Sequence, residues 1–235
     1  MKLTHALLIG LVVVILIFSV GALWYRPSNL NIDSSWIVLA NVTAGGWDDL
    51  KSASWLMQRY GCIFTSINET YSPDPMVNNF GQNVIIVGGS AERSRRLPWH
   101  VINRPLIITK PPSQPNVVVD VPTWTTGKIS TPKATYYLPA TIDEFVTKDY
   151  GYITAAYDAI LSRWLILISG WTGEATACGV KLFLDWEPQG KFANIQWVIY
   201  RRTNPITIVN GVYQPPSLTE WTLSRFTYEV VEIGP

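Results

Sequence analysis

The chain begins with a long run of apolar positions. Ala6 to Tyr25 contains no charged residue. About 20 helical residues span roughly 30 Å, which is the thickness of the hydrocarbon core of a bilayer. Trp24 and Tyr25 followed by Arg26 are typical of the place where a membrane helix meets water. The pattern therefore predicts an N-terminal transmembrane helix within residues 1–26.

A cleaved signal peptide is the alternative for this segment. Lys2 would then form its charged start, and Ala22 would precede the cleavage site. The apolar core of a cleaved signal is usually about 7 to 15 residues long, which is shorter than this run. The short N-terminal tail and the long polar remainder favour an anchor instead. We expect residues 1–26 to insert into the lipid bilayer of a cell or viral membrane, and residues 27–235 to form one extracytoplasmic domain.

The apolar pattern that follows alternates between strand and helix. Trp36–Asn41 is an apolar run of strand length. Residues 47–60 place apolar side chains at spacings of three and four, with two acidic residues in the first turn, as in an amphipathic helix that ends at Gly61. Cys62–Ile67 is the next strand. Two strands separated by one helix form a βαβ unit, so the sheet should be parallel.

Further runs predict more strands and a second helix. Asn83–Val87 is a continuous β-branched run, which is typical of a strand covered on both faces. Trp164–Ile168 is another buried strand, and residues 174–184 after it have the small side chains of a helix packed on a sheet. The remaining strand-like runs are Leu106–Thr109, Val117–Val119, Gly151–Ala155, Ile195–Tyr200, Ile206–Val209 and Phe226–Ile233.

These elements define the expected fold class. Proline and threonine are frequent between residues 109 and 141, where no helical period occurs, so we expect an ordered, strand-rich insertion there. The C-terminal tail is also strand-rich. The pattern as a whole predicts α/β: an N-terminal transmembrane helix followed by one mixed, largely parallel, Rossmann-like α/β domain.

Composition narrows the classes of function. Lys and Arg number 18 and Asp and Glu 17, so the formal net charge is +1. This balance argues against a nucleic-acid interface built on bulk positive charge, and we expect no nucleic-acid partner. The chain has 11 tryptophans and 11 tyrosines but only 15% charged residues. Such a composition is typical of a packed, weakly charged contact surface.

Two features usually linked to an extracytoplasmic location carry little weight here. Asn41 and Asn68 each stand two residues before a threonine and match the glycosylation sequon, but their number is what chance alone would give. Cys62 and Cys178 could form a disulfide outside the cell. The alternative, which we favour slightly, is two buried free thiols that act as small apolar side chains.

The motifs for catalysis are weak. Gly88-Gly89 after a strand and Gly170–Gly173 before a helix could point N–H groups at an anion, but neither matches a dinucleotide or P-loop motif, so we interpret both as tight turns. His100 has no GxSxG nucleophile elbow to accompany it. The scattered histidines and cysteines do not suit a metal site. We therefore predict no catalytic, cofactor-binding or metal-binding residue.

Charged pairs and clusters leave two alternatives open. Carboxylate pairs beside tryptophans could hydrolyse glycans, although positions at helix ends favour a structural role. These pairs are Asp48–Asp49, Asp143–Glu144 and Asp185 with Glu187. Arg93, Arg95 and Arg96 could contact anionic sugars, phosphates or lipid headgroups. The alternative for the three arginines is a solvated basic loop.

Three segments carry a resemblance to a known family. The first, from Trp36, is WIVLANVTAGGWDDLKSASWLMQRYG; the second, from Asn83, is NVIIVGGS; the third, from Asp149, is DYGYITAAYDAILSRWLILISGWTGEATACGVKLFL. In this order they resemble the α/β domain of archaeal S-layer surface proteins. Ser90-Ala91 departs from the family's usual Pro and nearby Asn, the chain is much shorter than a full S-layer subunit, and its expected anchor is N-terminal. The resemblance implies a surface-exposed domain, cellular or carried by an archaeal virus, rather than a lattice-forming subunit.

Together these features predict a non-catalytic surface or envelope protein, S-layer-like, that acts through protein–protein or protein–glycan contacts. Its partners would be surface proteins, glycans or a second copy of the chain in a homo-oligomer, with no cofactor. The alternatives are a tethered hydrolase and a glycan-binding module of the envelope. A concave cleft with two converging carboxylates would contradict the contact function, and a flat apolar face without a cleft would contradict the enzyme.

Overall fold

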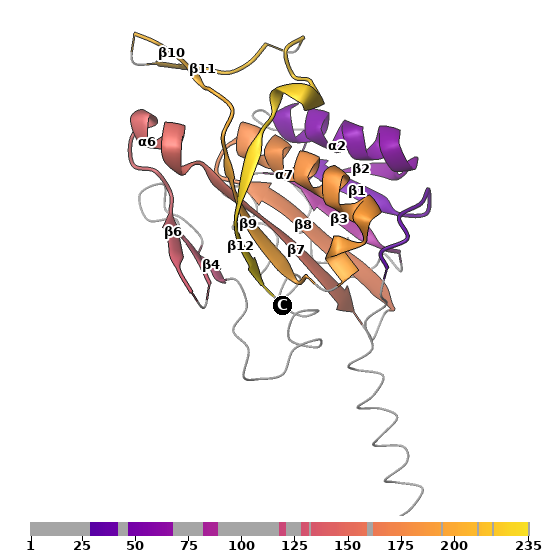
Figure 1. Ribbon diagram of the computed structural model, residues 1–235. Coiled ribbons are helices and arrows are strands. Elements are labelled where there is room, and N and C mark those ends of the chain that lie inside the picture. Colours follow the sequence, from indigo (N-terminus) through magenta and orange to yellow (C-terminus); the bar gives the residue numbers. More distant parts are fainter. Residues whose placement is uncertain are drawn as a thin grey trace, which may run out of the picture.

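The computed structural model describes residues 29–41, 47–67, 82–88, 118–120, 128–131, 133–158, 162–193, 195–210, 212–217 and 219–234 of the 235-residue chain. In this part of the chain a seven-stranded sheet carries helices on one face (Figure 1). A three-stranded sheet packs on the opposite face, and a two-stranded hairpin projects from the body.

The large sheet has the strand order β12-β9-β7-β8-β3-β1-β2. Its strands in chain order are β1 (Ile37–Asn41), β2 (Ile63–Ile67), β3 (Val84–Val87), β7 (Tyr150–Asp158), β8 (Arg163–Gly170), β9 (Trp197–Arg202) and β12 (Tyr228–Gly234). The three-stranded sheet consists of β4 (Val118–Asp120), β5 (Lys128–Ser130) and β6 (Thr135–Tyr137), which fall within the expected insertion. The hairpin consists of β10 (Thr207–Val209) and β11 (Val212–Gln214).

The helices are α2 (Trp47–Tyr60), α6 (Ile142–Lys148) and α7 (Gly173–Trp186), with short 3₁₀ helices at Glu187–Gln189, Lys191–Ala193 and Leu223–Arg225. α2 has the predicted bounds. It ends at Gly61, whose φ of 70° is easy for glycine, and whose N–H donates to the carbonyl oxygen of Met57 at 2.8 Å. The turn thus satisfies one of the carbonyl groups that a helix end leaves open.

The sheet is mixed, and the prediction of a largely parallel, Rossmann-like sheet is wrong. β2, β1, β3 and β8 are parallel neighbours, whereas β7 is antiparallel to β8 and β9, and β12 is antiparallel to β9. A parallel connection needs about a dozen residues or more. Asp158 and Arg163, which end β7 and begin β8, are too close in the chain for one. The α/β architecture is confirmed, and the error lies in the strand directions.

The expected N-terminal transmembrane helix is also corrected. Ala6 to Tyr25 lies outside the described residues. Within the described ranges, no helix is long and apolar enough to cross a membrane. The longest there are α2 and α7 with 14 residues each. Such a helix spans about 21 Å of the roughly 30 Å that a bilayer core requires. The transmembrane and single-pass assignments are therefore not kept.

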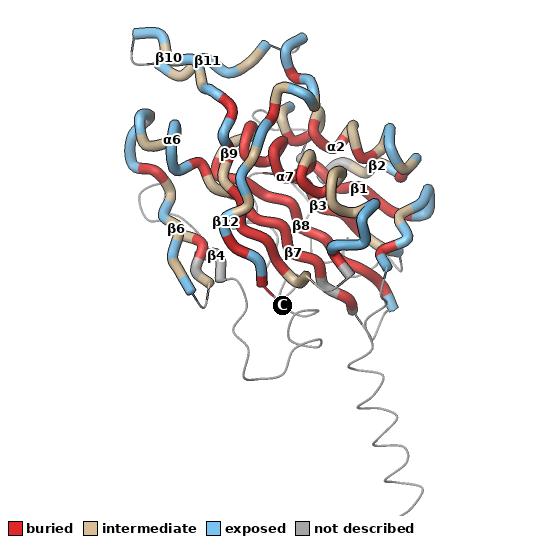
Figure 2. Tube along the Cα trace, viewed as in Figure 1, coloured by how far each residue is buried: buried red, intermediate tan, exposed pale blue. Residues whose placement is uncertain are grey.

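Alternate residues of the central strands face two separate cores. In β8, Trp164, Ile166 and Ile168 pack toward α2 and α7. Leu165 and Leu167 belong to the core on the opposite face, where β5 and β6 also contribute side chains. All eight residues of β8 are buried, and Figure 2 shows the same burial along the neighbouring strands. This two-sided burial explains why the strand is apolar throughout rather than alternating.

Two glycines, Gly179 in α7 and Gly151 in β7, make room for the side chain of Tyr200. Tyr200, in β9, is fully buried, and its hydroxyl donates a hydrogen bond to the carbonyl oxygen of Ser169 at 2.9 Å. A Cβ atom at Gly179 would stand 2.2 Å from the Tyr200 hydroxyl oxygen, and one at Gly151 would stand 2.3 Å from it. Glycine at both positions therefore leaves the room that the phenol ring occupies. The close fit sets how near the middle of α7 lies to the sheet.

In Gly179→Ala the added methyl group would clash with Tyr200, and we expect the free energy of unfolding to fall by about 1 to 3 kcal/mol. This loss comes in spite of the helix preference of alanine, which is favoured over glycine by about 1 kcal/mol. Urea unfolding of the full-length protein followed by tryptophan fluorescence measures the change. Lys181→Ala, on a half-exposed side of the same helix, is the control and should change it by less than about 1 kcal/mol. An unchanged or raised midpoint for Gly179→Ala would contradict the close packing.

Candidate functional site

Several elements meet at the edge of the sheet where β1, β3 and β8 end. α7 begins at this edge, directly after β8, with Thr172 as its N-cap. β7 is antiparallel to β8, so Asp149, which precedes it, lies at the same edge. β9 runs in the direction of β8, so Arg202 at its end lies there too. In α/β proteins, the carboxyl ends of parallel strands are the usual place for ligand sites.

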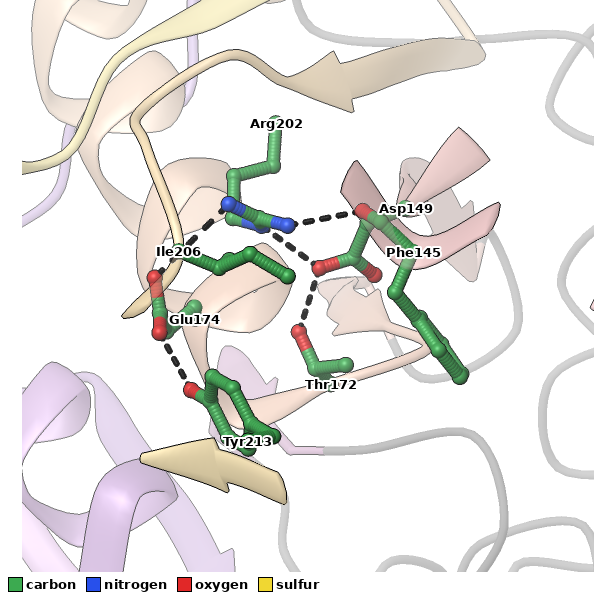
Figure 3. Close-up of a pocket in the computed structure, with 7 residues that line it drawn as sticks. All are labelled: Phe145, Asp149, Thr172, Glu174, Arg202, Ile206 and Tyr213. Carbon is green, nitrogen blue, oxygen red and sulfur yellow. Dashed lines mark hydrogen bonds and ion pairs between the residues drawn. The ribbon is translucent and has the colours of Figure 1, made fainter. Parts of the chain in front are cut away.

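The guanidinium group of Arg202 occupies the centre of this edge, and the residue is 2% exposed. Its Nε donates to Asp149 Oδ2 at 2.7 Å, and its Nη2 donates to the carbonyl oxygen of Phe145 at 2.8 Å (Figure 3). Its Nη1 donates to the carbonyl oxygen of Asn204 at 2.5 Å and lies 3.9 Å from Glu174 Oε2. A charge removed from water needs such partners, and all three nitrogens have one.

Asp149 connects this guanidinium to the start of α7. Its Oδ2 also accepts a hydrogen bond from the hydroxyl of Thr172 at 2.6 Å. The same hydroxyl oxygen caps α7 by accepting from the N–H of Ala175 at 3.0 Å. Asp149 is fully buried, yet its second oxygen, Oδ1, has no hydrogen-bond partner among the described residues. The carboxylate is therefore satisfied on one side only.

Glu174, in the first turn of α7, is the second buried carboxylate of the site. Its Oε2 accepts from Asn204 Nδ2 at 2.7 Å, and its Oε1 accepts from the hydroxyl of Tyr213. Asn204 is held in turn by the N–H of Thr227, which donates to its Oδ1 at 3.4 Å. Tyr213 lies in β11, so this contact connects the projecting hairpin to the body of the domain. Both oxygens of Glu174 are engaged.

Among the described residues, negative charge is in surplus at the site, because Asp149 and Glu174 both face the guanidinium of Arg202. Burial raises the pKa of Asp149 to about 6, since the loss of hydration outweighs the attraction of Arg202 and the hydrogen bonds that the carboxylate accepts. Asp48, at the start of α2, adds a third carboxylate nearby. Its pKa is raised by burial and by the charge of Glu174.

A cavity of about 220 Å³ lies beside these groups. Its walls come from α6, the start of β7, α7, the end of β9 and the hairpin. The residues that line it are Phe145, Asp149, Thr172, Glu174, Arg202, Ile206 and Tyr213 (Figure 3). The ionic side chains are turned toward one another, so the surface offered to a ligand consists mainly of the Phe145 and Tyr213 rings and the Ile206 side chain. Such a shape, apolar with a few polar groups, is typical of small-molecule sites.

The structure places the residues predicted from sequence mostly outside this site. Cys62 and Cys178 are buried free thiols, and Cys178 Sγ donates to Asn204 Oδ1 at 3.4 Å. Burial raises the pKa of both thiols, to about 11 for Cys62. Asn41 ends β1, and nothing is described of its side chain. Asn68 lies outside the described residues, as do Arg93, Arg95, Arg96 and His100.

Of the three predicted carboxylate pairs, the first brings Asp48 close to Glu174 of the site, and members of the other two have structural partners. Glu144 accepts from the N–H of Ala140 at 2.7 Å and from Lys148 Nζ at 2.9 Å. Asp185 accepts from Lys181 at 2.9 Å and from Tyr228 at 2.8 Å. The others stand at helix starts or accept single hydrogen bonds, as Glu187 does from Tyr60 at 2.8 Å. No group of three or more His, Cys, Asp or Glu side chains in the described ranges could hold a metal ion.

Sequence reasoning missed the residues that build the site. Asp149, Glu174 and Arg202 each stand at the border of an apolar run, which is where a sheet edge begins or ends. That signal was present, but it does not say which borders share an edge. The direction of β7 decides this, and the sequence pattern did not predict it.

Comparison with protein-family models, curated proteins and solved structures finds no match. The resemblance to archaeal S-layer surface proteins therefore stays a prediction.

Removing the guanidinium tests its role directly. Arg202→Met leaves two buried carboxylates without their cation, and we expect a loss of about 3 to 5 kcal/mol in the free energy of unfolding. Arg201→Met is the matched control, because Arg201 is half-exposed and pairs with Glu229 at the surface, a contact worth less than about 1 kcal/mol. Guanidinium chloride unfolding of both variants gives the comparison. If the two variants lost equal amounts of unfolding free energy, the central position of Arg202 would be contradicted.

The raised pKa of Asp149 predicts how stability depends on pH. Its value of about 6 lies above the ordinary 3.8, so the folded protein binds a proton that the unfolded protein has released. This contribution is fully present below about pH 4 and is lost as the pH rises through 6, by up to about 3 kcal/mol. The difference in unfolding free energy between the native protein and Asp149→Asn should therefore fall between pH 4 and pH 7. A difference that rises, or stays constant, would show that the pKa is not raised.

Proposed function

We propose that this protein is a non-catalytic binding domain that holds a small ligand in the cavity at the carboxyl edge of its sheet. The observation that carries the proposal is the cavity itself, which has apolar walls, a buried ionic floor and a position where α/β domains bind ligands. The proposal corresponds to the binding-module alternative rather than to a flat contact surface.

Binding is favoured over catalysis by the way the two carboxylates are held. General acid–base chemistry needs a carboxyl group within hydrogen-bonding reach of the reacting atom, and glycoside hydrolysis needs two. Both oxygens of Glu174 are engaged by Asn204 and Tyr213, and one oxygen of Asp149 is engaged by Arg202 and Thr172. The pair converges, as an enzyme would require, but it converges on a guanidinium group rather than on open space.

The hairpin covers one side of the cavity. Ile206, directly before β10, and Tyr213 of β11 line the cavity, while Val209 and Val212 near the turn are exposed. Among the described contacts, the hydrogen bond from Tyr213 to Glu174 connects the hairpin to the ionic floor. A hairpin held to the domain by few contacts opens at a low cost in free energy. Such opening would let a ligand enter the cavity.

Contact with surface proteins or glycans is a second candidate. The exposed Val209 and Val212 of the projecting hairpin, at 50% and 56%, and Trp47 at 62% favour it, because exposed aromatic and apolar side chains are what the core of an interface uses. The envelope location and the surface partners expected from the sequence stay predictions.

Filling the cavity tests the proposed function. A library of small fragments is screened against the full-length protein by ligand-observed NMR. We expect Ile206→Trp, which places an indole in the cavity, to weaken the bound fragments by roughly tenfold or more, or about 1.4 kcal/mol. Val209→Trp, on the exposed side of the same hairpin, should leave them bound. Absence of bound fragments, or equal binding by both variants, would contradict a ligand site here.

A further inference from the structure

The charged groups beside the cavity are turned away from it. Asp149, Glu174 and Arg202 are each at most 2% exposed, and their charges are directed at one another (Figure 3). Asp149 Oδ1, which has no hydrogen-bond partner among the described residues, is itself enclosed by protein atoms. Among the described residues that line the cavity, none therefore offers an exposed charge to a ligand.

The hydroxyl groups at the cavity are engaged in the same way. The hydroxyl of Thr172 donates to Asp149 Oδ2 at 2.6 Å and caps α7 through its oxygen. The hydroxyl of Tyr213 donates to Glu174. Because these groups already have partners within the protein, a ligand meets the ring of Tyr213 rather than its oxygen.

The cavity wall that a ligand contacts is therefore almost wholly apolar. It consists mainly of the rings of Phe145 and Tyr213 and the side chain of Ile206. A charged ligand would lose its hydration here without gaining a polar partner, which is costly in free energy. The faces of aromatic rings attract a cation, but two rings do not replace a whole hydration shell. An uncharged apolar ligand has no such cost.

Water is a poor occupant of such a space. A water molecule held in a cavity needs about two to four polar partners, and this wall provides few. Poorly held water is displaced by an apolar group with a gain in affinity. The same wall that excludes ions thus favours a ligand made of carbon.

The volume of the cavity sets the size of that ligand. The cavity measures about 220 Å³. An apolar protein cavity of about 150 Å³ holds a benzene molecule. The larger space has room for a benzene ring that carries a short alkyl substituent.

We propose that the cavity binds a small uncharged apolar molecule, of about the size of an alkylbenzene, with its carbon surface against Phe145, Ile206 and Tyr213. This inference rests on the proposed function and names its ligand class. The ionic groups position the wall and do not contact the ligand: Arg202 donates to the carbonyl oxygen of Phe145, and Glu174 accepts from Tyr213.

An isosteric pair of probes tests the ligand class. The hydrocarbon tert-butylbenzene and the cation phenyltrimethylammonium have nearly the same shape, but only the second carries a charge. The affinity of each for the full-length protein is measured at pH 7.5 by ligand-observed NMR. Binding in the cavity is the part that is lost in Ile206→Trp and kept in Val209→Trp. We expect the hydrocarbon to bind there at least about tenfold more tightly than the cation.

Changes at one half-exposed position of the wall separate charge from shape. Ile206→Glu supplies the carboxylate that the wall lacks, and it should reverse the preference so that the cation binds more tightly than the hydrocarbon. Ile206→Gln has the same length without the charge, and it should weaken the hydrocarbon by about three- to tenfold without admitting the cation. Val209→Glu adds the charge at an exposed position of the hairpin and should alter neither affinity. If Ile206→Glu does not fold, Ile206→Gln and Ile206→Trp decide.

The outcomes separate this inference from the proposed function. Binding of the cation as tightly as the hydrocarbon, or binding of polar fragments alone, would overturn the ligand class; if that binding is lost in Ile206→Trp, the cavity remains a ligand site. Hydrocarbon binding that survives Ile206→Trp would lie elsewhere and overturn the inference. Binding of neither probe, together with no fragment sensitive to Ile206→Trp, would overturn the inference and the proposed function alike.

Discussion

The buried guanidinium group of Arg202 is the constraint on which the arrangement of this domain depends. A positive charge without water must be surrounded by acceptors, and the chain supplies them from separate elements. Phe145 provides a carbonyl oxygen from α6, Asp149 a carboxylate from the start of β7, and Glu174 a carboxylate from α7. Glu174 then holds Tyr213 of the hairpin. Elements that are distant in sequence are thus positioned around one side chain, and the cavity is the space between them.

The start of α7 positions two of the acceptors of Arg202, namely the carboxylates of Asp149 and Glu174. Thr172 caps the helix and also donates to Asp149, so the position of the first turn and that of the carboxylate are coupled. The helix can lie this close to the sheet because Gly179 has no side chain against Tyr200. The ionic centre and the packing of α7 are thus connected through Thr172.

Local pattern was enough to predict the two long helices and the first part of the sheet. The period of residues 47–60 predicts α2 with its observed bounds, and the predicted helix 174–184 lies within α7. Parallel pairing of β1 with β2 follows from the helix between them. The direction of β7 was missed, because an apolar strand has the same pattern in a parallel and an antiparallel sheet. Without that direction, Asp149 and Arg202 cannot be brought together: 53 positions separate them in the chain.

The central claim is that the Arg202 guanidinium is enclosed and hydrogen-bonded in solution. The most direct measurement is the exchange of its Nε proton with solvent, followed by NMR in the native full-length protein. An enclosed proton exchanges only when the surrounding structure opens, so its protection relative to a free arginine side chain should match that of the slowest core amides, such as those of β8. A rate typical of exposed arginine side chains would contradict the claim, and with it the ionic floor of the cavity.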